Sequence, residues 1–208
     1  MSAGLDVRLA APRGAGDPAF LFDFASPDAY LAAERILSLA PVPVEWIPVR
    51  GAELEQGAAP ELGARARAAF EQLGTERSLQ RFVWPDPHPF DPSLALRAAT
   101  YAKGIGRVVA FSLAAFRQCY AAGRSLEDVD NVVIAASGCE MHPAAVIKGC
   151  ELRSTAAALE RATASARERG VRSVPAVYVP GPGEVPGQVF HGDAQLEAAM
   201  DALTRPVA

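Results

Sequence analysis

The chain has 208 residues, a length that suits one large domain or a small domain with an insertion. Its formal net charge is −4 and it has no basic run, which argues against nucleic-acid binding. No apolar run approaches the ~20 residues of a transmembrane helix, and the first residues lack the apolar core of a signal peptide. We therefore expect a cytoplasmic protein that binds neither nucleic acid nor membrane.

The N-terminal quarter of the sequence predicts a tail followed by strand, helix and strand. Residues 1–17 are rich in Ala, Gly and Pro and are typical of a flexible tail. The short apolar run at 19–24 predicts a buried strand, and residues 27–40 have helical spacing. A second strand is predicted at 42–49, broken by Pro48.

A long helical block and a second strand-containing segment follow. Residues 51–168 are almost wholly helical in pattern, with candidate helices at 60–73, 92–103, 106–121, 125–136, 142–148 and 150–168. Residues 174–179 and 186–191 flank turn residues and predict a β-hairpin, and residues 193–204 predict a closing helix.

This order predicts an α/β fold. A β-α-β half joined to a β-β-α half is the thioredoxin arrangement, so the helical block is an insertion within it. We expect a thioredoxin-like domain from residues 18–50 and 169–208, interrupted by a helical insertion at 51–168.

Four segments, in this order, resemble one protein family. They are FDFASPDAYLA (22–32), HPFDPSLALRAATYA (88–102), ERGVRSVPAVYV (168–179) and VFHGDAQLEAAMDAL (189–203). Together they resemble the 2-hydroxychromene-2-carboxylate isomerase and kappa-class glutathione transferase family of the DsbA-like thioredoxin superfamily. The resemblance implies a helical insertion of the DsbA type, a homodimer, and glutathione or another low-molecular-weight thiol as cofactor.

Ser26 has two interpretations. A serine before Pro27 at the first helical position is a common helix N-cap, in which its oxygen accepts a hydrogen bond. By resemblance, Ser26 stands where a thioredoxin keeps its nucleophilic cysteine and Ala29 where it keeps the second, so disulfide exchange here lacks its thiols. In the resembled family this serine holds the glutathione sulfur, which uses its hydrogen as donor.

The resemblance assigns further thiol-binding residues. A cis Val174–Pro175 bond would present the Val174 backbone to the cysteinyl part of glutathione; the alternative is an ordinary trans proline that starts a strand. The family's Asp-Arg pair aligns with Ala194 and Gln195, so that Asp193 either substitutes for the acid or caps the closing helix. Asp28 stabilises the helix start but would repel a bound thiolate.

Asp28, His88 and Trp46 are candidates for a substrate cleft, and other residues are set aside. His88, in the proline-rich stretch 84–92, is either an acid–base group or a packed loop residue, and Trp46 is either buried or part of the cleft. The cysteines are odd in number, Cys119, Cys139 and Cys150, which indicates buried or idle thiols and no disulfide framework. The histidines show no metal-ligand spacing, so we expect no metal.

These observations favour a thiol-dependent isomerase or transferase acting on an aromatic or electrophilic small molecule. The alternatives are a non-catalytic thioredoxin-fold binding module and a DsbA-like oxidoreductase-family protein that has lost its C-x-x-C motif.

Overall fold

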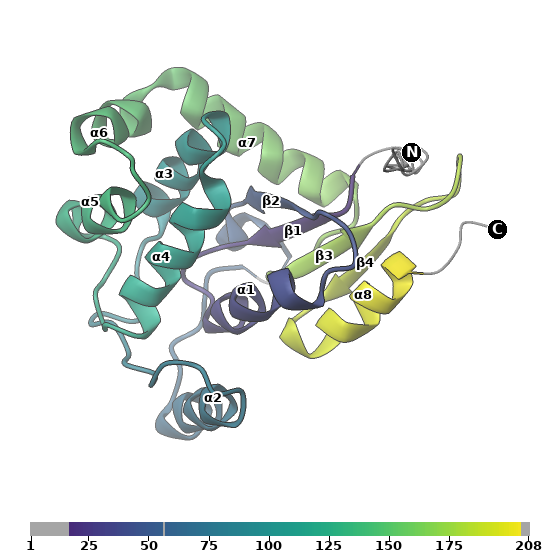
Figure 1. Ribbon diagram of the computed structural model, residues 1–208, viewed down its shortest axis with the longest axis horizontal. Coiled ribbons are helices and arrows are strands. Elements are labelled where there is room, and N and C mark those ends of the chain that lie inside the picture. Colours follow the sequence, from purple (N-terminus) through teal and green to yellow (C-terminus); the bar gives the residue numbers. More distant parts are fainter. Residues whose placement is uncertain (1–16, 56, 205–208) are drawn as a thin grey trace, which may run out of the picture.

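The computed structural model describes residues 17–55 and 57–204, and Figure 1 shows their arrangement. A four-stranded sheet has the order β2-β1-β3-β4. Strands β1 (Ala19–Phe22) and β2 (Glu45–Pro48) are parallel and joined by α1 (Pro27–Leu39). Strands β3 (Ala176–Val179) and β4 (Gln188–His191) form the predicted antiparallel hairpin, and β3 pairs with β1. The thioredoxin-like arrangement predicted from the sequence is confirmed.

The insertion between β2 and β3 is helical, as predicted. A short 3-10 helix, η1 (Gly51–Glu53), is followed by α2 (Ala64–Glu76), α3 (Ser93–Gly104), α4 (Val108–Tyr120), α5 (Val129–Ser137), α6 (Pro143–Glu151) and α7 (Arg153–Glu168). After β4 the chain forms the 3-10 helix η2 (Asp193–Gln195) and then α8 (Leu196–Thr204). No helix in the described part of the chain is long and apolar enough to cross a bilayer.

Several element boundaries differ from the sequence prediction. Strand β2 begins at Glu45 and not at residue 42, because Pro43 has no N–H to donate to the ladder. Helix α2 begins after Gly63, beyond the predicted start at residue 60. The predicted tail, apart from residue 17, lies outside the described residues.

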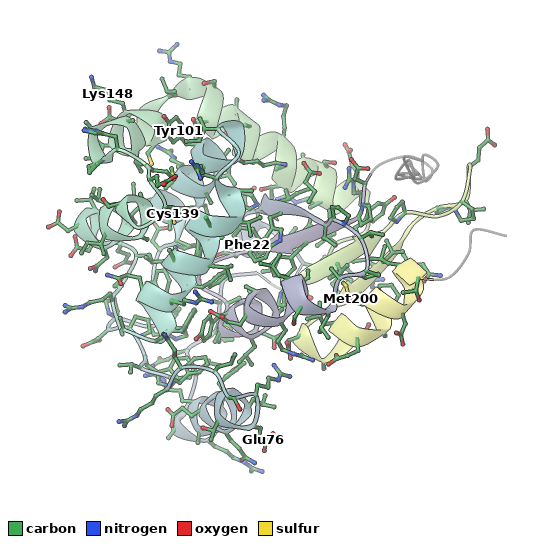
Figure 2. All side chains as sticks on the ribbon, viewed as in Figure 1. Phe22, Glu76, Tyr101, Cys139, Lys148 and Met200 are labelled. Atoms are coloured by element: carbon green, nitrogen blue, oxygen red, sulfur yellow. The ribbon has the colours of Figure 1, made fainter. Side chains whose placement is uncertain are left out.

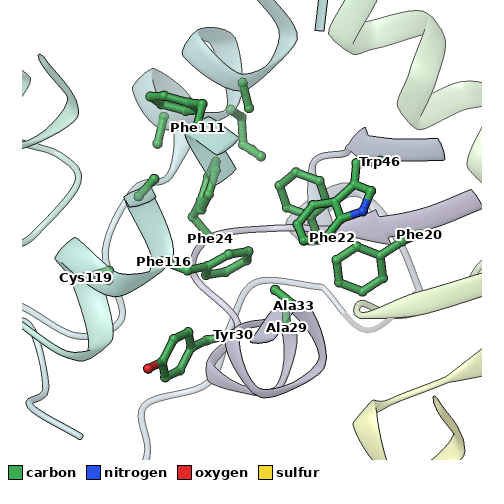
Figure 3. Close-up of a cluster of buried hydrophobic side chains, with 14 of the residues drawn as sticks. Phe20, Phe22, Phe24, Ala29, Tyr30, Ala33, Trp46, Phe111, Phe116 and Cys119 are labelled. Atoms are coloured by element: carbon green, nitrogen blue, oxygen red, sulfur yellow. The ribbon is translucent and has the colours of Figure 1, made fainter. Parts of the chain in front are cut away.

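The sheet buries both faces. On one face the rings of Phe20, Phe22, Phe24 and Phe116 pack with α1 and α4, with ring centroids of Phe24 and Phe116 4.8 Å apart (Figure 3). Met200 of α8 belongs to the same cluster (Figure 2). The opposite face packs against α7 through a smaller cluster, which includes Ala19, Leu21 and Ala166. This packing fixes the end of β1, where Asp23 and Ser26 follow.

Candidate functional site

The turn between β1 and α1 is held by a buried carboxylate. Asp23 is 4% exposed, and its oxygens accept hydrogen bonds from the backbone N–H groups of Ala25 (2.9 Å) and Gly51 (2.7 Å). Burial raises the pKa of Asp23 to about 6, against the lowering effect of these two hydrogen bonds. Asp23 therefore ties the backbone that presents Ser26 to the start of the insertion.

Ser26 is the N-cap of α1. Its Oγ accepts a hydrogen bond from the Ala29 N–H at 3.2 Å, so the capping prediction is confirmed. The hydroxyl also donates to the Val174 carbonyl oxygen at 3.4 Å, a long contact. Because capping uses the oxygen and this contact uses the hydrogen, the hydroxyl is able to turn toward a ligand without losing the cap.

The Val174–Pro175 peptide bond, opposite Ser26, is cis, as the resemblance implied. The carbonyl oxygen of Pro175 accepts a hydrogen bond of 2.8 Å from the Gly192 N–H. Gly192 has a φ of 80°, a conformation that glycine adopts readily. This turn holds the Val174–Pro175 segment beside the start of α1.

Two adjoining hollows meet at Ser26, and together they are called the Ser26 groove. Both are lined by Ala25, Ser26 and Val174. The first, of about 360 Å³, is mainly apolar and is also lined by Asp28, Ala58, Ala59, Pro60, Leu62, Phe70 and His88. The second, of about 310 Å³, is also lined by Asp23, Gly51, Ala52, Pro89, Phe90, Asp91, Pro92 and Glu127. The groove is therefore open at Ser26 and has one apolar and one more polar arm.

Asp28 lies in the groove, in the first turn of α1. Its Oδ2 accepts a hydrogen bond from the Asp193 N–H at 3.0 Å, which links α1 to η2. Burial is the main cause that raises the pKa of Asp28 above its ordinary value. A raised pKa favours the neutral carboxyl, which weakens the predicted repulsion of a thiolate.

His88 lies in the apolar arm of the groove. Its side chain packs edge-on against Trp84, with ring centroids 5.1 Å apart, and against Tyr120 at 6.1 Å. Burial, and then the charge of Arg67, lower the pKa of His88, so the imidazole is neutral at pH 7. Both ring nitrogens are buried and neither has a hydrogen-bond partner in the described residues. The ring thus carries an unused donor and an unused acceptor beside the groove.

The remaining predicted site residues do not line the groove. Trp46 is 1% exposed and stacks edge-on with Phe20 in the core, which corrects its assignment to the substrate cleft and confirms the alternative that it is buried. Gln195 is exposed on η2.

Asp193 neither lines the groove nor caps a helix. The cap of η2 is Gly192, and Asp193 makes no side-chain capping bond, so the capping interpretation is wrong. Its carboxylate pairs instead with Arg35 at 2.9 Å and with Arg77 at 2.5 Å. Because Arg35 lies on α1 and Arg77 directly after α2, both far from Asp193 in the sequence, the position of Asp193 at a helix start could not reveal them.

Sequence reasoning missed several residues of the groove, among them Asp23 and Phe70. An acid that follows a fully apolar strand is unusual, and that signal could have identified Asp23. Phe70 has no comparable signal, since one aromatic residue in an amphipathic helix is ordinary.

The cysteines are buried and lie outside the groove, as predicted. Burial raises the pKa of the Cys150 thiol to about 11 and that of Cys119 well above its ordinary value. Within residues 17–55 and 57–204, no group of three or more His, Cys, Asp or Glu side chains is placed to hold a metal.

The fold and the groove define a thioredoxin-fold protein with a serine at the N-cap of the helix that follows its first strand. Residues 19–204 match the model of the DSBA-like thioredoxin domain family, and the chain belongs to that family. No curated protein matches the sequence.

Solved structures share this fold at low sequence identity. A 2-hydroxychromene-2-carboxylate isomerase superposes with a TM-score of 0.74 and 18% identity, over 89% of this chain and 95% of that one. A probable DsbA oxidoreductase from Streptomyces coelicolor gives 0.71 and 20%, over 90% and 88%. The cytosolic disulfide reductase DsbM from Pseudomonas aeruginosa, solved with GSH, gives 0.61 and 16%, over 89% and 95%. At these identities the likeness concerns the fold.

Proposed function

We propose that this protein is a thiol-dependent isomerase or transferase that uses glutathione, or another low-molecular-weight thiol, on an aromatic or electrophilic small molecule. The observation that carries the proposal is the position of the half-buried Ser26 hydroxyl. It lies at the N-terminus of α1, opens on the groove, and lies beside the Val174–Pro175 segment.

The sulfur end of a thiol ligand fits these residues. The Ser26 hydroxyl would turn from its long contact with Val174 and donate to the sulfur while its oxygen continues to cap α1. The positive end of the α1 dipole adds to this and lowers the pKa of a nearby thiol. A bound thiol would supply a nucleophilic sulfur that adds to an electron-poor carbon.

The other end of glutathione fits less well. The resembled family's acid–arginine pair is replaced by Ala194 and Gln195, and the Asp193 carboxylate is engaged by Arg35 and Arg77. For this reason the proposal names a thiol and does not require glutathione.

The apolar arm of the groove suits the substrate. Its walls, which include Leu62 and Phe70, would cover a flat apolar body. Neutral His88 would place its unused donor or acceptor against a substrate oxygen after a small rotation of the ring, because both nitrogens are covered in the ligand-free protein.

Calorimetric titration with glutathione tests the thiol site. We expect saturable binding that weakens by roughly 10- to 150-fold in Ser26→Ala, the loss of a hydrogen bond to a charged group. Asp128→Ala is the matched control, since Asp128 caps α5 in the same way, through the Asp130 N–H, and lies outside the groove. S-methylglutathione, which has no thiol, should bind Ser26→Ala and the wild type alike.

Failure of glutathione, cysteine and other small thiols to bind would favour the non-catalytic binding module. If a thiol binds, turnover of a conjugated aromatic substrate separates the remaining outcomes. An isomerase leaves the thiol titre unchanged, whereas a transferase consumes one thiol per product. The family resemblance also proposes a homodimer, which sedimentation of the intact chain would test.

A further inference from the structure

A second cavity, of about 470 Å³, lies in the helical insertion where α3, α5 and α6 contact one another (Figure 1). Its walls are mainly aliphatic and include Leu94, Val129, Val132, Val133, Val146 and Ile147. Ser26 is not among the lining residues, and Asp91 is the one described residue that also lines the Ser26 groove, at its more polar arm, so the two sites adjoin only at Asp91. Its volume falls within the range of small-molecule sites, roughly 300–1,000 Å³.

One cationic side chain lines this cavity, Arg97 of α3. Its Nε is fully buried and has no hydrogen-bond partner. Among the described residues, the guanidinium makes neither a hydrogen bond nor an ion pair. Proteins rarely leave a buried donor unpaired, at a cost of roughly 1–3 kcal/mol. A ligand acceptor in the cavity would remove that cost after a small rotation of the side chain, because Nε is covered in the ligand-free protein.

Two acids, Asp91 and Glu151, also line the cavity, and both are exposed. The Asp91 carboxylate already accepts hydrogen bonds from the N–H (2.9 Å) and hydroxyl (2.5 Å) of Ser93. No ion pair joins either acid to Arg97 in the part of the chain that the structure describes. The acids therefore form no ion pair with the guanidinium. Because both are exposed, water and salt screen their repulsion of an anionic ligand, which is strongest for a ligand with more than one negative charge.

We propose that this cavity binds a small monocarboxylate with an aliphatic chain. The carboxylate pairs with the guanidinium of Arg97, whose planar array of donors matches the geometry of carboxylate oxygens. The chain lies against the valine and isoleucine side chains of α5 and α6. This site is independent of the thiol proposed for the Ser26 groove.

Calorimetry with octanoate, hexanoate and octanol tests the proposal on the full chain. We expect octanoate to bind the wild type, and hexanoate to bind more weakly by about fourfold for each methylene removed. Arg97→Met keeps an unbranched apolar side chain and removes the charged guanidinium, and should weaken octanoate binding at least tenfold. Octanol, which has no charge, should bind the wild type and Arg97→Met alike.

A second variant keeps the test independent of any effect of Arg97→Met on folding. Ile147 is 41% exposed at the cavity, so Ile147→Trp fills the opening from the surface and should also abolish octanoate binding. Ile134→Trp is the matched control, because Ile134 is 55% exposed on α5 and does not line the cavity. The proposal is wrong if octanoate does not bind the wild type, or if it binds Arg97→Met and Ile147→Trp as tightly. Ser26→Ala should bind octanoate as tightly as the wild type does, so a failure of the thiol proposal is distinguishable from a failure of this one.

Discussion

Asp23 gives a quantitative test of how the turn before Ser26 is held. The change is Asp23→Asn, which keeps one oxygen acceptor for the two backbone N–H groups of Ala25 and Gly51 and removes the titration. The pKa of Asp23 is raised from 3.8 to about 6 in the folded protein, chiefly by burial. The folded chain therefore binds this proton more tightly than the unfolded chain does.

The sign and size of the pH effect follow from this shift. A raised folded pKa contributes stability that is fully present below the unfolded value of 3.8 and is lost as the pH rises through about 6. A shift of about two units corresponds to about 3 kcal/mol at 1.36 kcal/mol per unit. The free energy of unfolding of the wild type, relative to Asp23→Asn, should therefore fall by about 3 kcal/mol between about pH 4 and about pH 7.

Urea denaturation of both proteins at several pH values, followed by tryptophan fluorescence, measures this difference. Asp201→Asn, at an exposed position on α8, is the control and should follow the wild type at every pH. The reasoning would be refuted if the free energy of unfolding of the wild type minus that of Asp23→Asn stayed constant or rose with pH.

Four further substitutions test the packing and the charges. Gly149→Ala should destabilise by about 1–3 kcal/mol, because the new Cβ would clash with the ring of Tyr101 (Figure 2). Gly104→Ala, where the new Cβ meets open space, should stabilise by about 0.4–1 kcal/mol, and thermal melts compare the pair. Asp193→Asn should lower the free energy of unfolding by about 3 kcal/mol, because Arg35 and Arg77 lose their buried partner. Urea denaturation measures this change, and a change near zero contradicts the prediction. The pKa of His88 is lower in the folded than in the unfolded chain, so the wild type should lose stability as the pH falls below 6.5. His88→Phe should not show this loss, and parallel pH profiles of stability for the two proteins would contradict the prediction.

Local signals in the sequence predicted the order of the elements and the helix start at Ser26. Apolar runs and helical spacing depend on neighbouring residues, so they can be recognised in the sequence without knowledge of the fold. The predicted boundaries of β2 and α2 were less accurate. Prolines and the partner strand decide where a strand begins, and helix ends are hard to locate to within one or two residues.

The candidate site was predicted in part. Ser26 and Val174–Pro175 lie together as the resemblance implied, and Asp28 and His88 line the same groove. The different locations of His88 and Trp46 were not predictable, since both are aromatic residues in stretches that contain prolines. Only the packing decides that one faces the groove and the other the core.

The amino-acid sequence by itself determined the α/β order, the insertion and the cap of α1, because these depend on contacts within a few residues. The tertiary structure alone decided that Asp193 pairs with Arg35 and Arg77, and that Arg97 stands unpaired in a separate cavity. Electrostatic and hydrogen-bond partners are chosen by distance in space, and burial sets their strength. For residues far apart in the chain, the sequence therefore indicates neither the partner nor the burial, because both depend on the fold.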